Sequence, residues 1–205
     1  MSPVALSDRF DRALIYATQV HAGQLRKGTE IPYVAHLLAV AALVLEHGGD
    51  EDQAIAALLH DAAEDHGGEV RLADIRGRFG GRVEAIVRDC SDALPVVGEP
   101  KKPWKERKDD YLRHLEQVDE SVLLVSAADK LHNARAVLLD YQEVGEAVFE
   151  RFKGGRDGTL CYYLKVAKVL ARLLPGSLTR ELAETVAHLD KLVAAAAAEP
   201  AGVKP

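Results

Sequence analysis

The apolar positions of this 205-residue chain recur three and four residues apart over most of its length, which is the spacing of an amphipathic α-helix. Across residues 7–21, for example, Phe10, Leu14, Ala17 and Val20 fall on one helical face. No segment shows the strict alternation of a half-buried strand. The pattern predicts helices over residues 7–21, 33–46, 50–65, 72–79, 83–91, 104–115, 121–139, 141–152, 159–174 and 178–198.

The helix predicted over 50–65 differs from the others because it is apolar on nearly every side between Ala54 and Leu59, so it is expected at the centre. The polar stretch 21–32 is expected to be a turn. Residues 95–103 contain three prolines and are expected to form a loop beside a functional site. We predict one all-α domain, a helical bundle, over residues 1–193, followed by an Ala-rich tail over 194–205 that frays.

Composition narrows the class of protein. The chain is 48% apolar but only 5% aromatic, which favours helix over sheet. Its formal net charge of −6 gives no global basic surface, so we expect no nucleic-acid partner. The two cysteines, Cys90 and Cys161, form neither a disulfide framework nor a zinc signature. Residues 1–9 do not resemble a secretion signal, and no apolar run is long enough to span a membrane, so a cytoplasmic protein without a membrane partner is expected.

The first candidate chemical feature is His60-Asp61, followed by Glu64-Asp65, at the end of the most apolar helix. The His-Asp pair alone is explained more simply by a helix that emerges into solvent. The acidic pair one turn later changes this, because residues three and four apart share a helical face and the carboxylates would repel one another. A divalent cation among them would remove the repulsion, and mixed His/Asp ligation suits manganese, iron or zinc better than calcium.

Two further features lie far away in the chain. Asp129 ends the apolar run 122–128, and Asn133 follows one turn later on the same face. His36 lies near the start of the helix predicted over 33–46. Each feature is ambiguous alone, but together they supply two histidines and two aspartates from three separate helices. The predicted metal ligands are therefore His36, His60, Asp61 and Asp129.

These residues resemble the motifs of the HD-domain phosphohydrolases, in which a histidine, a His-Asp pair and a distant Asp follow one another. The closer resemblance is to the (p)ppGpp hydrolase domain of the RelA/SpoT family, in the stand-alone form of the small alarmone hydrolases. It extends from about Phe10 to Leu139. It rests on the segments 24–28, 32–36, 57–65, 79–80, 86–87 and 129–133. No synthetase domain is expected, because the chain ends at Pro205.

The resemblance implies one Mn²⁺ ion, hydrolysis of the 3′-pyrophosphate of an alarmone, and Glu64 and Asp65 as catalytic residues. It also implies substrate contacts at Arg26, Lys27 and Asn133. This chain has Ala136 where the family usually has a threonine that contacts the base, so guanine and adenine alarmones both remain candidates.

The remaining polar and aromatic residues have two interpretations each. Arg26 could contact phosphate or stack on the purine. A basic group could meet the remaining substrate charge or form an ordinary solvated surface, namely Lys101, Lys102, Lys105, Arg107 and Lys108. Four aromatic residues are expected to serve packing rather than substrate binding, namely Tyr33, Trp104, Tyr162 and Tyr163.

Two other functions fit parts of the pattern. Another HD phosphohydrolase, acting on nucleoside monophosphates or a cyclic dinucleotide, would share the four ligands. Arg26-Lys27 and Glu64-Asp65 argue against it. A catalytically silent HD module that senses a nucleotide would not need an intact ligand set with both acidic residues beside it. The substrate expected from the sequence is a small anionic nucleotide.

Overall fold

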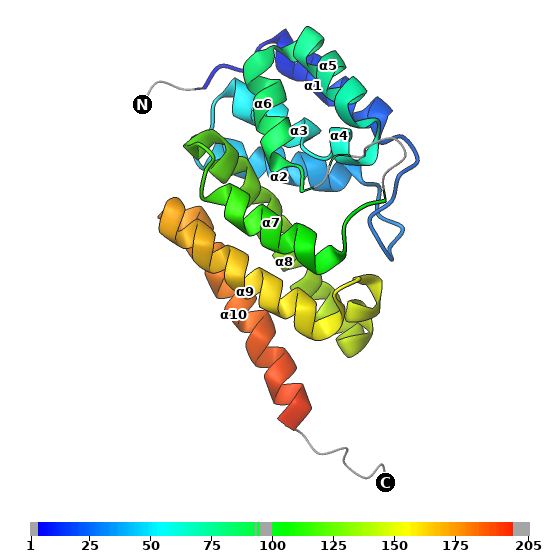
Figure 1. Cartoon of the computed structure of the whole chain (residues 1–205), viewed down its shortest axis with the longest axis vertical. Helices are drawn as coiled ribbons and strands as arrows, with labels where there is room; N and C mark the ends of the chain where they lie inside the picture. Colours follow the sequence, from blue (N-terminus) through cyan, green and yellow to red (C-terminus); the bar gives the residue numbers. More distant parts are fainter. Residues whose placement is uncertain (1–3, 93, 95–99, 199–205) are drawn as a thin grey trace.

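Helices form nearly everywhere that the spacing of apolar residues predicts them (Figure 1). The structure is a computed structural model that describes residues 4–92, 94 and 100–198. Within these ranges the only β pairing is an isolated bridge between Leu25 and Pro32, so the all-α prediction is confirmed. The helices are α1 (Asp8–Val20), α2 (Val34–Glu46), α3 (Glu51–Leu59), α4 (Ala62–Asp65), α5 (Gly68–Phe79), α6 (Gly81–Cys90), α7 (Trp104–Leu115), α8 (Glu120–Val144), the 3₁₀ helix η1 (Gly145–Arg151), α9 (Gly155–Leu173) and α10 (Ser177–Ala198).

Side-chain caps fix the starts of three helices that carry or support the site. The Ser7 side chain accepts a hydrogen bond from a first-turn backbone N–H of α1. Asp50 and Gln53 form a reciprocal capping box at α3, and Asp119 accepts from two backbone N–H groups of α8. These bonds satisfy donors that a helix start would otherwise leave without partners.

The prediction of one helix over 50–65 is wrong, because the chain breaks into α3 and α4 at His60-Asp61. The separation of 121–139 from 141–152 is also wrong. Helix α8 continues to Val144, because Tyr141 is buried in the core and packing overrides the weak local signal. The segment that follows is a 3₁₀ helix and not an α-helix.

Helices α5 and α9 begin earlier than predicted, at Gly68 and Gly155. Glycine is typical of helix ends, yet it is tolerated in a first turn, where few backbone bonds are at stake. The predicted boundary at residue 193 stays a prediction, since α10 is helical to Ala198 and residues 199–205 lie outside the described ranges. Residues 95–99 of the predicted loop also lie outside them.

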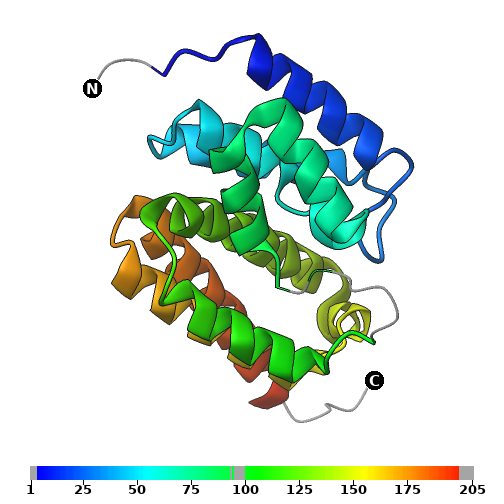
Figure 2. The same ribbon diagram turned by 45° about the horizontal axis from the view of Figure 1, so that its top comes forward.

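Helix α8 connects the two ends of the molecule. It packs against α2, α3 and α6, and also against α9, α10 and η1 (Figure 2). Its first half carries buried apolar residues on nearly every side, and so does α3. Both helices belong to one large hydrophobic cluster, while a smaller cluster joins the second half of α8 to η1, α9 and α10. The polar residues on these two helices are therefore held at fixed positions.

Among the described helices, none combines the length and the apolar character that crossing a lipid bilayer demands.

Gly49, in the turn before α3, approaches α2 so closely that a side chain would collide with it. A Cβ atom there would lie 2.8 Å from the backbone oxygen of Val44 and 3.1 Å from Leu124 Cδ2. We expect Gly49→Ala to lower the free energy of unfolding by about 1–3 kcal/mol in urea denaturation. The matched control is Gly77→Ala on the open surface of α5, which should stabilise the protein by about 0.5–1 kcal/mol. Equal unfolding midpoints for wild type and Gly49→Ala would contradict the expectation.

Candidate metal centre and active site

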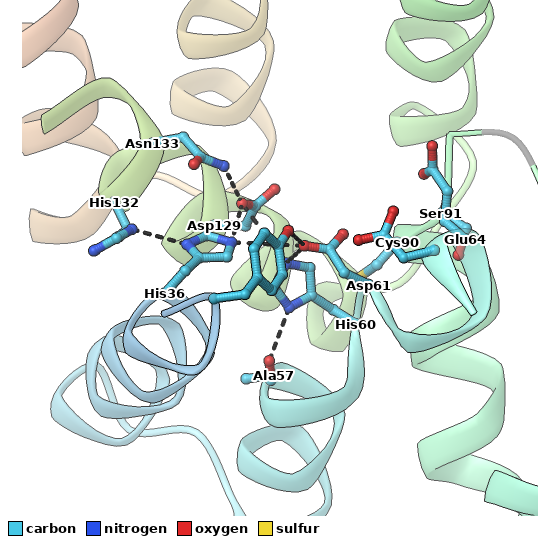
Figure 3. A network of polar contacts seen from close by, with 12 residues as sticks. His36, Ala57, His60, Asp61, Glu64, Cys90, Ser91, Asp129, His132 and Asn133 are labelled. Carbon is cyan, nitrogen blue, oxygen red and sulfur yellow. Dashed lines mark hydrogen bonds and ion pairs between the residues drawn. The ribbon is translucent and has the colours of Figure 1, made fainter. Parts of the chain in front are cut away.

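The four predicted metal ligands form a small ring in which histidine nitrogens alternate with aspartate oxygens (Figure 3). His36 Nε2 lies 3.3 Å from Asp129 Oδ1 and 3.7 Å from Asp61 Oδ2. His60 Nε2 lies 3.0 Å from Asp61 Oδ2 and 3.7 Å from Asp129 Oδ1. Two ligands of a tetrahedral or octahedral ion with bonds of about 2.1 Å lie about 3.0–3.4 Å apart. The ring is therefore close to the size that a divalent cation requires.

The helix break positions two of these residues. Consecutive side chains on a regular helix point about 100° apart, so His60 and Asp61 could not both face one point from a continuous helix. At Asp61 the backbone has φ −95° and ψ −7°, at the edge of the right-handed helical region and outside a regular helix. This turn directs both side chains into the ring. His36 comes from the first turn of α2, and Asp129 from the middle of α8.

Outer contacts orient the two histidines. His60 Nδ1 is 2.8 Å from the carbonyl oxygen of Ala57, to which it donates a hydrogen bond, so its Nε2 lone pair faces the ring. His36 Nδ1 is 2.8 Å from His132 Nδ1. Burial lowers the pKa of His132 to about 4, so this imidazole is neutral. Its Nδ1 can therefore accept a hydrogen bond from the Nδ1–H of His36. Both histidines thus present a basic nitrogen to the same point.

The carboxylates of the ring are held in their charged form. Burial disfavours the charge on Asp129, yet Lys130 and the two histidines keep its pKa well below the ordinary value. Burial opposes the charge of Asp61 as well, and His60 overcomes it and lowers the pKa. Burial lowers the pKa of His60, but both carboxylates outweigh it and hold that pKa well above the usual value. The ring therefore attracts positive charge, either a proton on His60 or a cation.

A cation fits these residues on two grounds. His60 Nε2 is buried and makes no hydrogen bond of good geometry, although it lies 3.0 Å from Asp61 Oδ2 and 3.7 Å from Asp129 Oδ1. A buried polar atom without a partner is costly, and coordination would satisfy it. Two imidazoles and two carboxylates also form a donor set suited to first-row divalent ions rather than to calcium. His36, His60 and Asp129 are buried, whereas the Asp61 side chain is 25% exposed.

Tyr33 departs from the expectation of simple packing. Its hydroxyl donates a short hydrogen bond to Asp61 Oδ2, and its ring stacks on His21. Because burial raises the pKa of Tyr33 far above its ordinary value, the hydroxyl keeps its proton and remains a donor. Tyr33 therefore fixes the orientation of Asp61 from outside the ring.

Glu64 lies one turn beyond Asp61 in an acidic environment of its own. Its Oε2 accepts a hydrogen bond from the backbone N–H of Asp92, while Lys101 Nζ and Arg107 Nη1 lie 3.3 and 3.9 Å from its Oε1. Burial and the neighbouring Asp92 carboxylate raise the pKa of Glu64 to about 7. Asp92 is itself held in the charged form by Lys108 and Arg107. Glu64 can therefore gain and lose a proton near neutral pH.

Asp65 faces a different group of residues from Glu64. Its Oδ2 accepts a hydrogen bond of 2.8 Å from the Gln24 side chain, and it clusters with His21 and His66. The structure therefore separates the two acidic residues that the sequence placed together. Whether both take part in catalysis stays a prediction.

A cavity of about 210 Å³ lies beside the ring. Arg26, Lys27 and Asn133, the three predicted substrate contacts, all line it. Arg26 Nη2 donates to Asn133 Oδ1 over 2.9 Å, and the Asn133 amide donates to Asp129. A chain of hydrogen bonds thus joins the cavity to the ring. Other lining residues include Tyr33, Ala136, Asp140, Arg151, Phe152 and Tyr163.

Sequence reasoning overlooked two residues that support the site. His132 is adjacent to the predicted ligands in sequence and could have been found from its spacing of three residues after Asp129. Asp92 ends no apolar run and precedes a proline-rich segment, so nothing in the sequence pointed to it. Among the basic residues considered for substrate binding, Lys101 and Arg107 approach Glu64, while Lys108 pairs with Asp92 and Lys102 with Asp110.

Comparison with known proteins identifies the class to which this fold and site belong. The profile of the HD domain matches residues 13–160, which is more than half of the chain. The chain therefore belongs to the HD domain family. It is 36% identical over 133 residues to guanosine-3′,5′-bis(diphosphate) 3′-pyrophosphohydrolase MESH1 of Xenopus tropicalis, covering 61% of this chain and 70% of that protein. The resemblance to small alarmone hydrolases is thereby confirmed.

The chain matches only a small part of its longer relatives. The guanosine-3′,5′-bis(diphosphate) 3′-pyrophosphohydrolase of Aquifex aeolicus is 32% identical over 140 residues, which cover 67% of this chain but 19% of that enzyme. A solved structure of a metazoan ortholog of SpoT that hydrolyses ppGpp superposes on this chain with a TM-score of 0.70 at 24% identity. It covers 92% of this chain and 97% of the solved one, and this likeness shows that the fold is shared.

The raised pKa of Glu64 predicts a pH-dependent effect on the stability of the metal-free protein. The unfolded chain releases the Glu64 proton near the ordinary pKa of 4.5, whereas the folded protein keeps it to about pH 7. The folded state therefore loses stability as the pH rises between these values. Glu64→Gln removes this loss and should stabilise the protein at pH 8, relative to pH 5, by on the order of 1–3 kcal/mol. Urea denaturation at both pH values tests it, and a difference independent of pH would contradict it.

Proposed function

We propose that this protein hydrolyses the 3′-pyrophosphate of ppGpp or a related alarmone, giving the nucleoside 5′-diphosphate, or triphosphate, and pyrophosphate. The observation that carries the proposal is the ring of two imidazoles and two carboxylates, in which His36, His60 and Asp129 are buried, beside a cavity lined by Arg26 and Lys27. The substrate is proposed from the activity named for its relatives in Xenopus tropicalis and Aquifex aeolicus. Because that substrate is an intracellular nucleotide, we place the reaction in the cytoplasm.

One Mn²⁺ ion, held by His36, His60, Asp61 and Asp129, is the proposed cofactor. A divalent ion in such a site polarises a phosphoryl oxygen and lowers the pKa of bound water. The donor set of two nitrogens and two oxygens suits a first-row divalent ion, and manganese is proposed among these ions from the resemblance to the (p)ppGpp hydrolase domain. His132 and Ala57 hold the imidazoles in the tautomer that binding requires, and Tyr33 holds Asp61.

Glu64 is the proposed general base. The reaction forms a bond between a water oxygen and the phosphorus attached to the ribose 3′ oxygen, and breaks the bond between that phosphorus and the 3′ oxygen. The water loses a proton to Glu64, and the 3′ oxygen gains one. A carboxyl group with a pKa of about 7 can accept and return a proton at neutral pH. Lys101 and Arg107, near Glu64, are placed to offset the added phosphate charge. Asp65 is proposed to assist from the other side.

Arg26, Lys27 and Asn133 are the proposed substrate contacts in the cavity. Lys27 supplies a flexible cation for phosphate, while the planar guanidinium of Arg26 suits either phosphate or the face of a purine. Asn133 reaches both Arg26 and Asp129, so it links substrate binding to the ring.

Removing one ring carboxylate should remove both metal and activity. We expect Asp129→Ala to lose Mn²⁺, measured by elemental analysis, and to lower the rate of ppGpp hydrolysis by about 1,000-fold or more. Asp157→Ala, at an exposed position in the first turn of α9, is the control and should leave both unchanged. Activity that persists in metal-free Asp129→Ala would overturn the proposed mechanism.

Substrate identity is tested on the same Mn²⁺-loaded protein. ppGpp, pppGpp and the adenine analogue ppApp are incubated beside nucleoside monophosphates and a cyclic dinucleotide. We expect release of pyrophosphate from at least one of the first three. Turnover of only a monophosphate or a cyclic dinucleotide would favour another HD phosphohydrolase, and binding without any turnover would favour a nucleotide sensor.

Glu64→Gln should separate catalysis from metal binding. The variant keeps the shape of the side chain but cannot accept a proton, so we expect the rate to fall by about 100- to 10,000-fold while Mn²⁺ content stays at the wild-type level. Glu69→Gln, on the exposed face of α5, is the matched control and should retain full activity. A fully active Glu64→Gln would show that another group moves the proton.

A further inference from the structure

A second group of metal-ligating side chains lies outside the ring. His21, Asp65 and His66 each offer one ligand atom, and these three atoms all lie within 4.8 Å of one another. His21 is the residue at which α1 ends, while Asp65 and His66 lie at the end of α4. None of the three is among the four ring residues. The cluster joins two segments that are more than forty residues apart in the sequence.

A single side chain marks the point on which the three residues converge. The Gln24 amide oxygen lies 2.7 Å from His21 Nδ1 and 2.6 Å from His66 Nε2. The amide nitrogen of the same residue donates to Asp65 Oδ2 over 2.8 Å. Because one amide group reaches all three, the donor atoms surround a volume about the size of one small ligand. Gln24 lies in a turn before α2, so its side chain is not held in a helix.

The residue types suit a transition-metal ion. Two imidazoles and one carboxylate, with room for a water, are a common set of ligands for zinc. Nitrogen-rich sites of this kind favour zinc, cobalt or nickel over magnesium and calcium. His21 is only 3% exposed, and its ring stacks on Tyr33 at a centroid distance of 5.1 Å. Its Nδ1 is the ring atom that faces Gln24 and would bind the ion, whereas its Nε2, which points away from Gln24, is buried without a hydrogen-bond partner.

We propose that His21, Asp65 and His66 form a second site, which binds a zinc-class divalent ion when the Gln24 side chain turns aside. The ion takes the place of the Gln24 amide among the three side chains. Binding there and the hydrogen bond from Gln24 to Asp65 therefore exclude one another. His66 and Asp65 are partly or fully open to solvent, which gives the ion a path into the site.

The test counts metal equivalents and does not depend on any enzymatic activity. Full-length protein without a polyhistidine tag is stripped with a chelator. It is then titrated with Co²⁺, followed by visible absorption, and with Zn²⁺, followed by calorimetry. We expect wild type to bind two equivalents and His66→Ala to bind one. Because His66 is partly exposed, we expect this variant to fold. Asp129→Ala should retain one equivalent, and the double variant should bind none. His188→Ala, which removes an exposed imidazole from α10, should still bind two.

Gln24→Ala gives a directional readout that a purely structural role for the cluster would not produce. If Gln24 competes with the ion, its removal should tighten the second equivalent about tenfold or more while the first is unchanged. A single equivalent for wild type would overturn the proposal. So would a second equivalent that survives His66→Ala, or one that disappears in His188→Ala. Asp65 belongs both to this cluster and to the proposed catalytic residues, but metal equivalents are counted without any activity, so this test and the Mn²⁺ hydrolysis assay fail independently.

Discussion

The burial of Asp129 beside Asp61 is the constraint on which the rest of this structure depends. Two charged carboxylates in a helical core are unfavourable unless cationic or hydrogen-bond-donating groups surround them. Lys130 meets Asp129 from one side, with its ammonium 4.9 Å from the ring of Tyr111, while the Tyr33 hydroxyl meets Asp61 from the other. What remains between the carboxylates is a pair of imidazole nitrogens. The most apolar segments of α3 and α8 are therefore followed by polar residues, His60-Asp61 and Asp129. These residues lie where a cation can offset the charge of the two carboxylates.

The same constraint gives two neighbouring carboxylates different chemistry. Glu64 enters a region where Asp92 already carries a negative charge, so its proton is retained to higher pH. Asp65, one residue later, turns toward Gln24 and the surface. Side chains at successive positions of a helix diverge by about 100°, which is enough to place one beside α6 and the other beside the turn before α2. An acidic pair in sequence is thus two separate sites in space, one suited to proton transfer and the other open to a competing ligand.

Much of the fold and of the ring could be predicted from the sequence, for physical reasons. Apolar spacing follows helical geometry directly, so the helices were found. Polar residues at the end of long apolar runs are rare, so His60, Asp61 and Asp129 can be recognised from the sequence, and His36 from its place at the start of a helix. The break at His60-Asp61 could not be predicted, because both residues are compatible with a continuous helix and only tertiary packing decides. Asp92 was missed since its role comes from Arg107, Lys108 and Glu64, which meet it only in the folded chain.

Under the proposed function, the preference for a guanine or an adenine nucleobase also involves residues outside the family motifs. Ala136 gives the cavity no hydroxyl, but Asp140 and Arg151 on the same lining form an ion pair. Arg151 also lies against Gly28, where a Cβ atom would come within 2.7 Å of its Nε, so the backbone turn after Lys27 and the guanidinium are closely fitted. A carboxylate and a guanidinium held in this way offer both an acceptor and donors to a purine edge. Under the proposed function, we therefore expect discrimination between guanine and adenine to involve this ion pair as well as position 136.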